Sequence, residues 1–406
     1  MQNMSTIQAA EPLRPDFDTI LERVAALGPR FADRAMATEK ARRVSEETMA
    51  ELRETGLFKV MQPRRFGGYE YPPSAMARVG FELGRHCGST AWCGTLAVCF
   101  GWMTAFFPLE AQEEVWADTD NLLAVSYTPT PKVTPVEGGY RIAGSWPWAS
   151  GIDSAAWTIL AGLAPNPAGE GPPMLSWFLV PVRDIVIDHD SWNVAGLQGT
   201  GSKTVHIPEP VFVPAHRVLP IKAVMTGAVP GRDIPDNPQA NYTYPTFGPT
   251  ALVSPIVGMA QGAVEAFTEI AAGATRLARP GVFEKVAESK LIQRLVGSNA
   301  ARVDAARVMM LTSLQEGEAV IENGCTLTIE QRTRIRRNHG FAGRTAAEVT
   351  QALYNKSGAA AAGLEFKVQR QWRDANSAAT HSSIDWDMLA EMYGPQMLGL
   401  QPVGIF

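Results

Sequence analysis

The sequence predicts an α+β fold in which helices come first, a β domain second and a helical bundle last. Apolar residues recur at helical spacing from about residue 17 to residue 118. Short alternating runs separated by turn residues occupy about 122 to 218. Long amphipathic helices return from about 249 to 400. Helices and strands that occupy separate parts of a chain, rather than alternating, are typical of the α+β class.

These three zones set the predicted domain boundaries. We expect an N-terminal α-helical domain over residues 1–120 and a central antiparallel β-barrel domain over 121–220. A linker loop and a C-terminal four-helix bundle should fill 221–406. A chain of 406 residues is long enough for several domains around a large core.

The N-terminal zone predicts helices over 39–57, 74–83 and 89–107. The first should end at Gly56, because glycine commonly terminates a helix. The last is apolar nearly throughout, which predicts a buried helix rather than a surface one.

The central zone contains short apolar or alternating runs at 140–143, 157–160, 176–180 and 203–207. Gly-Gly, Pro-Asn-Pro and Gly-Pro-Pro separate them, which favours antiparallel strands joined by turns. The following stretch, 221–244, is rich in Pro, Gly and Asn and is predicted to be a long loop of the kind that often has a function.

The C-terminal zone predicts four long helices, over 251–272, 282–317, 329–357 and 366–386. Short connections between long amphipathic helices are typical of a bundle.

Composition excludes several classes of function. The 41 acidic and 36 basic residues give a net charge of −5, and no basic stripe indicates a nucleic-acid partner. The N-terminus lacks a signal-peptide pattern, and no apolar run of about 18 residues predicts a membrane span. The four cysteines and six histidines lack metal-ligand spacing, so we expect a cytoplasmic protein with reduced thiols and no metal.

Two nucleotide-binding motifs are absent from the sequence. The run Gly196–Thr204 (GLQGTGSKT) has Ser202 between its last glycine and Lys203, and a strand rather than a helix follows, so it is not a P-loop. No GxGxxG follows a predicted strand, so the chain should carry no nicotinamide-binding domain of its own.

Three other motifs follow one another along the chain. A strand leads into the turn Gly144–Gly151 (GSWPWASG), the run Gly196–Ser202 (GLQGTGS) leads into another strand, and Trp372–Ala375 (WRDA) precedes His381. In this order they resemble the acyl-CoA dehydrogenase family. Dehydrogenases of that family have a catalytic glutamate where this chain has His381. The histidine, together with Trp148 and Ser150, resembles the reduced-flavin-dependent, two-component aromatic monooxygenases.

This resemblance implies a cofactor and its chemistry. Reduced FMN or FAD would be supplied by a separate NAD(P)H:flavin reductase and would react with O2 to form a C4a-hydroperoxyflavin. Ser150 would hydrogen-bond flavin N5, and Trp148 would cover the ring. His381 would hold or supply the proton of the terminal peroxide oxygen as a general acid, since a histidine pKa of about 6.5 leaves both protonation states accessible.

The resemblance also implies a homotetramer in which a neighbouring chain completes each flavin site. The dehydrogenases hold the FAD pyrophosphate with an Arg-x-x-Phe motif; here Phe283 remains, but Pro280 occupies the arginine position. Arg279 and Lys290 could pair with a flavin phosphate instead. The alternative is that both are solvated charges. The absence of the arginine from this motif favours FMN, or a loosely held flavin of either kind.

The substrate is predicted from residues on the buried helix. Phenol-hydroxylating relatives place a histidine where this chain has Phe100, and without that base a phenolate is harder to form. An indole-like or other fused heteroaromatic substrate is therefore expected. Trp92, Phe100, Met103 and Tyr127 could line a flat aromatic pocket, although ordinary core packing explains them equally well.

Three alternatives stay open at this point. One is a phenol ortho-hydroxylase of the same family. Another is a true acyl-CoA dehydrogenase, but Asp374, Asp385 and Asp387 are the only carboxylates near the catalytic position and none fits it. The third is a catalytically silent protein of this fold that acts as a subunit.

Overall fold

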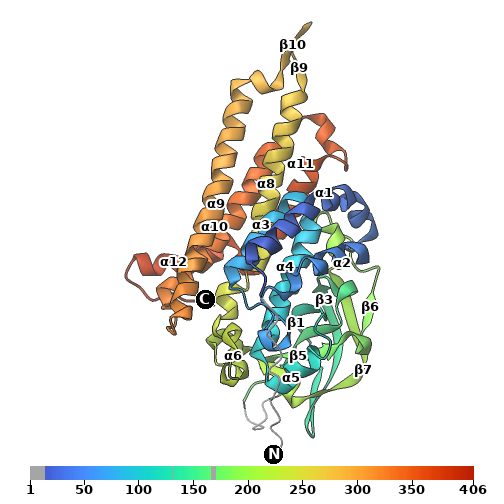
Figure 1. The fold of residues 1–406 in the computed structure, drawn as a ribbon, viewed down its shortest axis with the longest axis vertical. Coiled ribbons are helices and arrows are strands. Elements are labelled where there is room, and N and C mark those ends of the chain that lie inside the picture. The colour runs from blue at the N-terminus through green and yellow to red at the C-terminus, as the bar shows by residue number, and fades with distance from the viewer. Residues whose placement is uncertain (1–13, 131, 166–170) are drawn as a thin grey trace, which may run out of the picture.

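The computed structural model describes residues 14–130, 132–165 and 171–406. Helices come first, strands β1 to β8 follow, and helices return after them (Figure 1). This order confirms the predicted α+β class, whereas the residues at which the domains divide stay a prediction. The N-terminal helices are α1 (Phe17–Ala41), α2 (Glu46–Glu54), α3 (Pro73–His86), α4 (Gly88–Met103) and α5 (Leu109–Val115).

The single helix predicted over 39–57 is wrong, because α1 and α2 meet in this stretch. α1 ends where Arg42 adopts the left-handed backbone conformation, with φ 54°. α2 begins after Ser45, whose Oγ accepts a hydrogen bond from the Thr48 backbone N–H at 3.2 Å. A serine in this position is a standard N-cap, and it was the sequence signal for a new helix.

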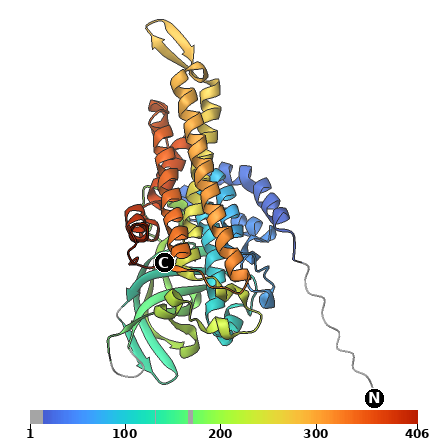
Figure 2. The same ribbon diagram turned by 90° about the vertical axis from the view of Figure 1, so that its left-hand side faces the viewer.

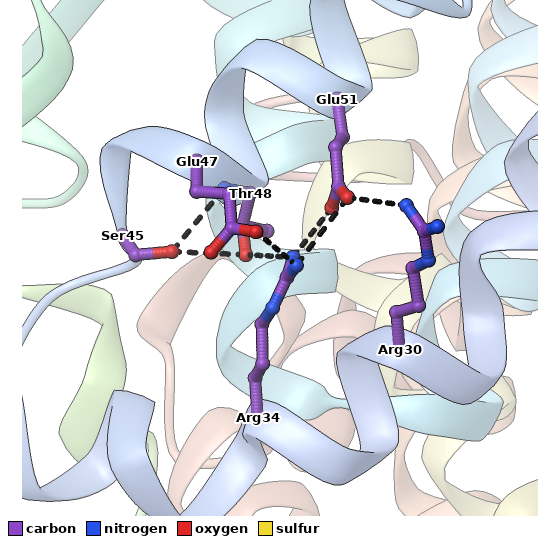
Figure 3. Close-up of polar contacts among 6 residues, drawn as sticks. All are labelled: Arg30, Arg34, Ser45, Glu47, Thr48 and Glu51. Carbon is purple, nitrogen blue, oxygen red and sulfur yellow. Dashed lines mark hydrogen bonds and ion pairs between the residues drawn. The ribbon is translucent and has the colours of Figure 1, made fainter.

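Ion pairs join α1 to α2 (Figure 3). Arg34 Nη1 lies 2.5 Å from Glu51 Oε2, and Arg30 Nη1 lies 2.7 Å from Glu51 Oε1. Arg34 also contacts Glu47 at 2.5 Å. Partly exposed pairs of this kind add little stability, so their main effect is to fix how the two helices cross.

Helix α4 is buried along its whole length, as its apolar composition predicted. It packs against α3, against β1 of the β domain and against α8 of the C-terminal bundle. Side chains on different faces of α4 therefore reach both halves of the molecule, which makes this helix the shared wall of any site between them.

The described strands form two four-stranded sheets. Their spatial orders are β1-β4-β5-β8 and β2-β3-β7-β6. All described pairings in these sheets are antiparallel except β1 with β4, which run parallel. The strands are β1 (Leu123–Thr130), β2 (Val133–Val136), β3 (Gly139–Ala149), β4 (Trp157–Ala164), β5 (Met174–Pro181), β6 (Val186–Asp188), β7 (Lys203–Pro214) and β8 (Val218–Pro220).

The stretch predicted to be a loop, 221–244, contains the short helix α6 (Ile221–Thr226) and two 3-10 turns before α7 (Tyr244–Phe247). Buried hydrogen bonds fasten it to the N-terminal helices. Trp102 Nε1–H donates to Gln239 O at 2.9 Å, and Asn237 Nδ2–H donates to Ala105 O at 2.9 Å. The segment is thus an ordered connection that places Tyr244 close to α4.

Four long helices form the C-terminal bundle, as predicted. They are α8 (Thr250–Gly273), α9 (Lys290–Glu322), α10 (Ile329–Tyr354) and α11 (Lys367–Ala378). The stretch Tyr244–Gly273 is long and apolar enough to cross a membrane, but 89% of its most apolar window is buried inside the protein, as befits a core helix. α12 (Trp386–Met397) follows α11 and packs against α10.

Two predicted helix boundaries in this region are wrong. A hairpin of β9 (Thr275–Arg279) and β10 (Val282–Lys285) stands where the second helix was expected to begin. Pro280 and Gly281, with Gly281 at φ 77°, form its turn. The hairpin projects from the end of the bundle farthest from the sheets (Figures 1 and 2). The last predicted helix, over 366–386, instead ends at Ala378.

Candidate active site

Ser150 lies in a tight turn just after β3. Trp148 has left-handed backbone torsions, with φ 63°, which is rare for a large side chain. Gly151 also has positive φ, at 72°, and its N–H donates to Thr200 O at 3.1 Å. The turn leaves the Trp148 side chain 65% exposed. Strained backbone of this kind persists where neighbouring structure holds it, and it is common at functional sites.

A chain of hydroxyl groups fixes the orientation of Ser150. Its Oγ lies 2.6 Å from Ser202 Oγ, which lies 2.7 Å from Thr200 Oγ1. Thr200 donates its proton to Leu197 O at 2.9 Å. Because each hydroxyl has one proton, Ser202 then donates to Thr200, and Ser150 donates to Ser202. The Ser150 oxygen is left with lone pairs that can accept.

One of those lone pairs accepts a hydrogen bond from Trp92 Nε1–H on α4 at 3.4 Å. The indole of Trp92 also lies beside the imidazole of His381, with ring centroids 6.5 Å apart. Trp92 therefore lies between the two residues that the sequence predicted to be catalytic, Ser150 and His381. These two come from segments more than 200 positions apart in a chain of 406 residues.

His381 is not on a helix. It caps a 3-10 turn (Ser382–Ile384) after α11, and its Nδ1 accepts from the Ser383 backbone N–H at 3.2 Å. Burial lowers the pKa of His381, and the positive charge of Arg336 lowers it further. The ring is therefore neutral near pH 7. With Nδ1 occupied as an acceptor, its proton is on Nε2, where it can be donated to an oxygen.

The residues that precede His381 hold the glycine-rich run in place. Asp374 Oδ1 accepts from the Leu197 backbone N–H at 2.6 Å, and Arg373 Nη1–H donates to Ala195 O at 2.7 Å. Arg373 also pairs with Glu39 of α1 at 2.9 Å, and both side chains are buried. Asp374 is 1% exposed, and burial raises its pKa to about 7. The Arg-Asp pair is thus a structural clamp.

Gly199 shows how closely the glycine-rich run packs. Its N–H donates to Ser89 Oγ on α4 at 3.1 Å. A Cβ at this position would lie 2.5 Å from the Thr38 methyl carbon on α1. Only glycine fits between the two helices, and this contact sets the position of Thr200 and Ser202.

Comparisons with known proteins agree with this geometry. The family model described as acyl-CoA dehydrogenase, N-terminal domain, matches residues 19–118, and the acyl-CoA dehydrogenase C-terminal domain matches 250–386. The FADH(2)-dependent resorcinol hydroxylase, oxygenase component, of Rhizobium sp. (strain MTP-10005) is 37% identical over 392 residues, covering 95% of both chains.

Two solved structures have the same fold. The 3-HSA hydroxylase from Rhodococcus sp. RHA1 superposes with a TM-score of 0.89 at 34% identity, covering 96% of this chain and 100% of that one. XiaF from Streptomyces sp., in complex with FADH2 and glycerol, gives a TM-score of 0.87 at 27% identity, covering 96% and 97%. The chain belongs to the flavin-dependent oxygenase components of the acyl-CoA dehydrogenase family. The resemblance found in the sequence is thereby confirmed.

The predicted substrate-pocket residues of this oxygenase do not all meet. Trp92 lies beside Ser150 and His381, whereas Met103 and Tyr127 contact each other. Trp92 is 6% exposed and touches both Ser150 and His381, as described above. Met103 lies further along α4, with its Sδ 3.7 Å from the Tyr127 hydroxyl of β1. Phe100 is 3% exposed on the same helix. The role of all four as a substrate pocket stays a prediction.

The two predicted phosphate-binding residues are not brought to Ser150. Arg279 ends β9, and Lys290 begins α9, where its Nζ donates to Gln293 Oε1 at 3.2 Å. Both are exposed, and both lie at the hairpin end of the bundle, away from the β domain (Figure 1). Within one chain of the oxygenase they cannot share a ligand with Ser150.

Sequence reasoning did not assign a role to four residues of this candidate site. Ser202 and Thr200 were recognised only as part of the glycine-rich run, which was rejected as a P-loop and used as a family motif without a role for either hydroxyl. Tyr244, whose hydroxyl lies 2.5 Å from that of Tyr127, was placed in a loop. Arg336 of α10 donates from Nη2 to Ser383 O at 2.8 Å, two residues from His381. The sequence feature that could have identified Arg336 is an arginine at a core-facing position of a predicted helix.

Proposed function

We propose that this oxygenase uses O2 and a reduced flavin, supplied by a separate flavin reductase, to hydroxylate a small electron-rich aromatic compound. The observation that carries the proposal is the arrangement of Ser150 and His381 on either side of Trp92. The carboxylate of Asp153, which lines the small cavity beside Ser150, is paired with Lys203 at 2.5 Å. The names of the resorcinol hydroxylase and of the XiaF complex support FADH2 as the reductant.

The residues around Ser150 fit a flavin ring. Ser150 Oγ retains a lone pair beyond the one used by Trp92, and a reduced flavin presents an N–H at N5. The exposed Trp148 side chain beside it offers a flat apolar face. A small cavity lined by Ser150, Gly151 and Thr200, among others, adjoins the turn. When bound, the reduced flavin supplies the electrons that activate O2.

Within that arrangement each protein group has a separate task. The hydroxyl chain from Ser150 to Thr200 keeps the Ser150 lone pair turned toward a ring N–H. His381 holds a proton on Nε2 and can donate it to an oxygen beside the Trp92 ring. Trp92 and the buried face of α4 exclude water, which otherwise promotes loss of hydrogen peroxide.

We propose two classes of aromatic substrate. The absence of a base at Phe100 favours an indole-like or other fused heteroaromatic compound. The resorcinol hydroxylase at 37% identity favours a ring that carries hydroxyl groups. Both are electron-rich and flat, which suits a site beside the Trp92 ring.

The assembly that we propose is a homotetramer in the cytoplasm. The β9–β10 hairpin exposes Phe283 by 70% and Leu277 by 59%, which is unfavourable for a monomer in water. A neighbouring chain covering this hairpin would bring Arg279 and Lys290 to the phosphate of its flavin. Light scattering at micromolar concentration tests the assembly, and a monomer would contradict it.

The function is tested with purified protein, NADH, flavin and a panel of aromatics. We expect no NADH oxidation until a flavin reductase is added, and then a hydroxylated product from at least one phenol or indole. Rapid NADH oxidation by the chain alone would contradict the two-component scheme. Bleaching of bound FAD by an acyl thioester without O2 would instead identify a dehydrogenase.

A further inference from the structure

Arg336 is a buried guanidinium with unused hydrogen-bond donors. The residue is 5% exposed, and of its donor atoms only Nη2 has a partner, Ser383 O. Nε and Nη1 are enclosed without a hydrogen-bond partner among the residues that the structure describes. Burying a charged group with unsatisfied donors is unfavourable, so such a group is expected where a ligand completes its hydrogen bonds.

The other arginines on α10 have a carboxylate or an aromatic ring as partner, although Arg332, which lies over the Phe406 ring, also has a buried Nε without a hydrogen-bond partner. Arg334 pairs with Glu316, and Arg344 pairs with Glu348 at 2.9 Å. Arg337 stacks its guanidinium over the ring of Tyr393, 4.3 Å from the centroid. Within the described residues, Arg336 has no carboxylate within ion-pair distance. Its charge is therefore available to an anion that is not part of this chain.

The surroundings of Arg336 connect it to the candidate active site. Its partner Ser383 also donates a backbone N–H to His381 Nδ1. The charge of Arg336 lies close enough to His381 and to the buried His339 to lower the pKa of both rings. Burial raises the pKa of Tyr244, whose hydroxyl contacts Tyr127, and the charge of Arg336 opposes this rise.

His339 adds a second unused polar atom. It lies on α10 one turn after Arg336, is 1% exposed, and its Nε2 is 3.1 Å from Thr250 Oγ1. Its Nδ1 has no hydrogen-bond partner in the described part of the chain. Burial lowers the pKa of His339 to about 3, so the ring is neutral at working pH. A neutral imidazole beside a guanidinium can share an oxygen ligand with it.

We propose that Arg336, with His339 beside it, binds an anionic oxygen of the aromatic substrate, either a carboxylate or an ionised ring hydroxyl. The inference rests on the proposed function, because it places the substrate ring beside His381. A planar guanidinium matches oxygen anions in geometry and is always charged. It would also hold a ring hydroxyl in its ionised form although Phe100 provides no base.

The test measures binding, not turnover, on the oxygenase loaded with oxidised flavin. Calorimetric titration uses benzoate, which has only a carboxylate; resorcinol, which has only ring hydroxyls; and indole, which has neither. The variants are Arg336→Gln and Arg336→Lys. Arg334→Gln, which removes an exposed charge from the same helix, is the matched control.

We expect Arg336→Gln to weaken benzoate, resorcinol or both by about ten- to a hundredfold, the range for a hydrogen bond to a charged group. Indole affinity should change by less than about threefold. The ligand that is weakened identifies the oxygen source as carboxylate or ring hydroxyl. Arg336→Lys should retain part of the affinity, and Arg334→Gln should retain all of it.

Three results would overturn the inference. The first is an equal loss of affinity for indole, benzoate and resorcinol. The second is unchanged affinity for both benzoate and resorcinol. The third is a loss of affinity for the flavin alone. The first would show that Arg336 only supports the turn at Ser383. If Arg336→Gln does not fold, the ratio of benzoate or resorcinol affinity to indole affinity in Arg336→Lys decides. Because no O2 or reductase is used, a failure of hydroxylation leaves this test intact.

Discussion

The two ends of the proposed flavin site differ in how much of each lies within one chain. At the Ser150 end, residues from the turn after β3, α4 and the glycine-rich run meet through hydrogen bonds of 2.6 to 3.4 Å, and His381 from the turn after α11 lies beside the Trp92 ring. At the hairpin end, Arg279 and Lys290 are exposed beside Phe283, which is 70% exposed. The residues proposed for the first end meet within one chain, whereas those proposed for the second do not meet them there.

This difference separates the residues proposed for catalysis from the residues whose proposed role requires a neighbouring chain. The groups proposed to face the reacting part of a flavin are fixed by the fold of a single chain, so they should tolerate changes in oligomeric state. In the proposed assembly, the groups proposed for the phosphate depend on a neighbouring chain. Substitutions at the first end should affect product formation, whereas substitutions at the second should affect cofactor affinity.

The largest expected effect is at His381. His381→Ala removes the Nε2 proton donor, and product formation on every substrate should fall by about 10²–10⁴-fold, the usual range for a general acid or base. Product is measured by chromatography with excess reductase and flavin. His206→Ala, an exposed histidine on β7, is the control and should be unchanged. Near-normal product from His381→Ala would refute its catalytic role.

Ser150→Ala should have the next largest effect. It removes the hydroxyl proposed for flavin N5 and leaves Ser202 without its donor. A lost hydrogen bond of about 1–3 kcal/mol corresponds to roughly ten- to a hundredfold less product per O2 consumed. The missing oxygen should appear as hydrogen peroxide, measured by a peroxidase assay. Ser145→Ala, on the exposed face of β3, is the control. An unchanged ratio would reject the assignment.

The hairpin end tests the other half of the comparison. Replacing both Arg279 and Lys290 with Ala should weaken flavin binding by about fivefold, since exposed charge pairs contribute roughly 1 kcal/mol or less. Fluorescence titration with FMN and with FAD measures this and shows which flavin binds more tightly. Lys285→Ala, on the same hairpin, is the control. Unchanged affinity for both flavins would show that the two charges are only solvated.

Much of the fold could be predicted because its signals are local. The apolar composition of α4 alone predicted its burial, and turn residues predicted the strands. The predicted helix boundaries were wrong where one or two residues determine where a helix begins or ends. The left-handed Arg42 and the cap at Ser45 split one predicted helix, and the Pro280–Gly281 turn converted a predicted helix start into a hairpin.

Residues of the candidate site could be predicted only where they belong to a recognisable sequence motif. His381, Ser150 and Trp148 were found through their sequence context. Arg336 and His339 were not, because their importance comes from burial without partners, which periodicity does not reveal. The role of Arg373 and Asp374 as a clamp on the glycine-rich run likewise depends on contacts about 177 residues apart in sequence.

The smallest expected effect concerns this clamp and distinguishes it from catalysis. The folded pKa of Asp374, about 7, lies above its ordinary value of 3.8. The folded protein therefore binds this proton more tightly than the unfolded chain does. The stabilisation is fully present below about pH 4 and is lost as the pH rises through 7. Asp374→Asn keeps an oxygen acceptor for the Leu197 N–H and cannot ionise.

Between pH 5 and pH 8, the melting temperature of the wild type should therefore fall by a few degrees more than that of Asp374→Asn, about what roughly 2–3 kcal/mol produces in a protein of this size. Product formation by the variant at pH 7 should stay close to the wild-type level, because the carboxylate holds backbone and touches no reacting atom. Asp387→Asn, at an exposed position near the start of α12, serves as the control. Parallel melting curves for wild type and variant would refute the shifted pKa. A loss of product comparable to that of His381→Ala would instead move Asp374 from the clamp to the catalytic end of the site.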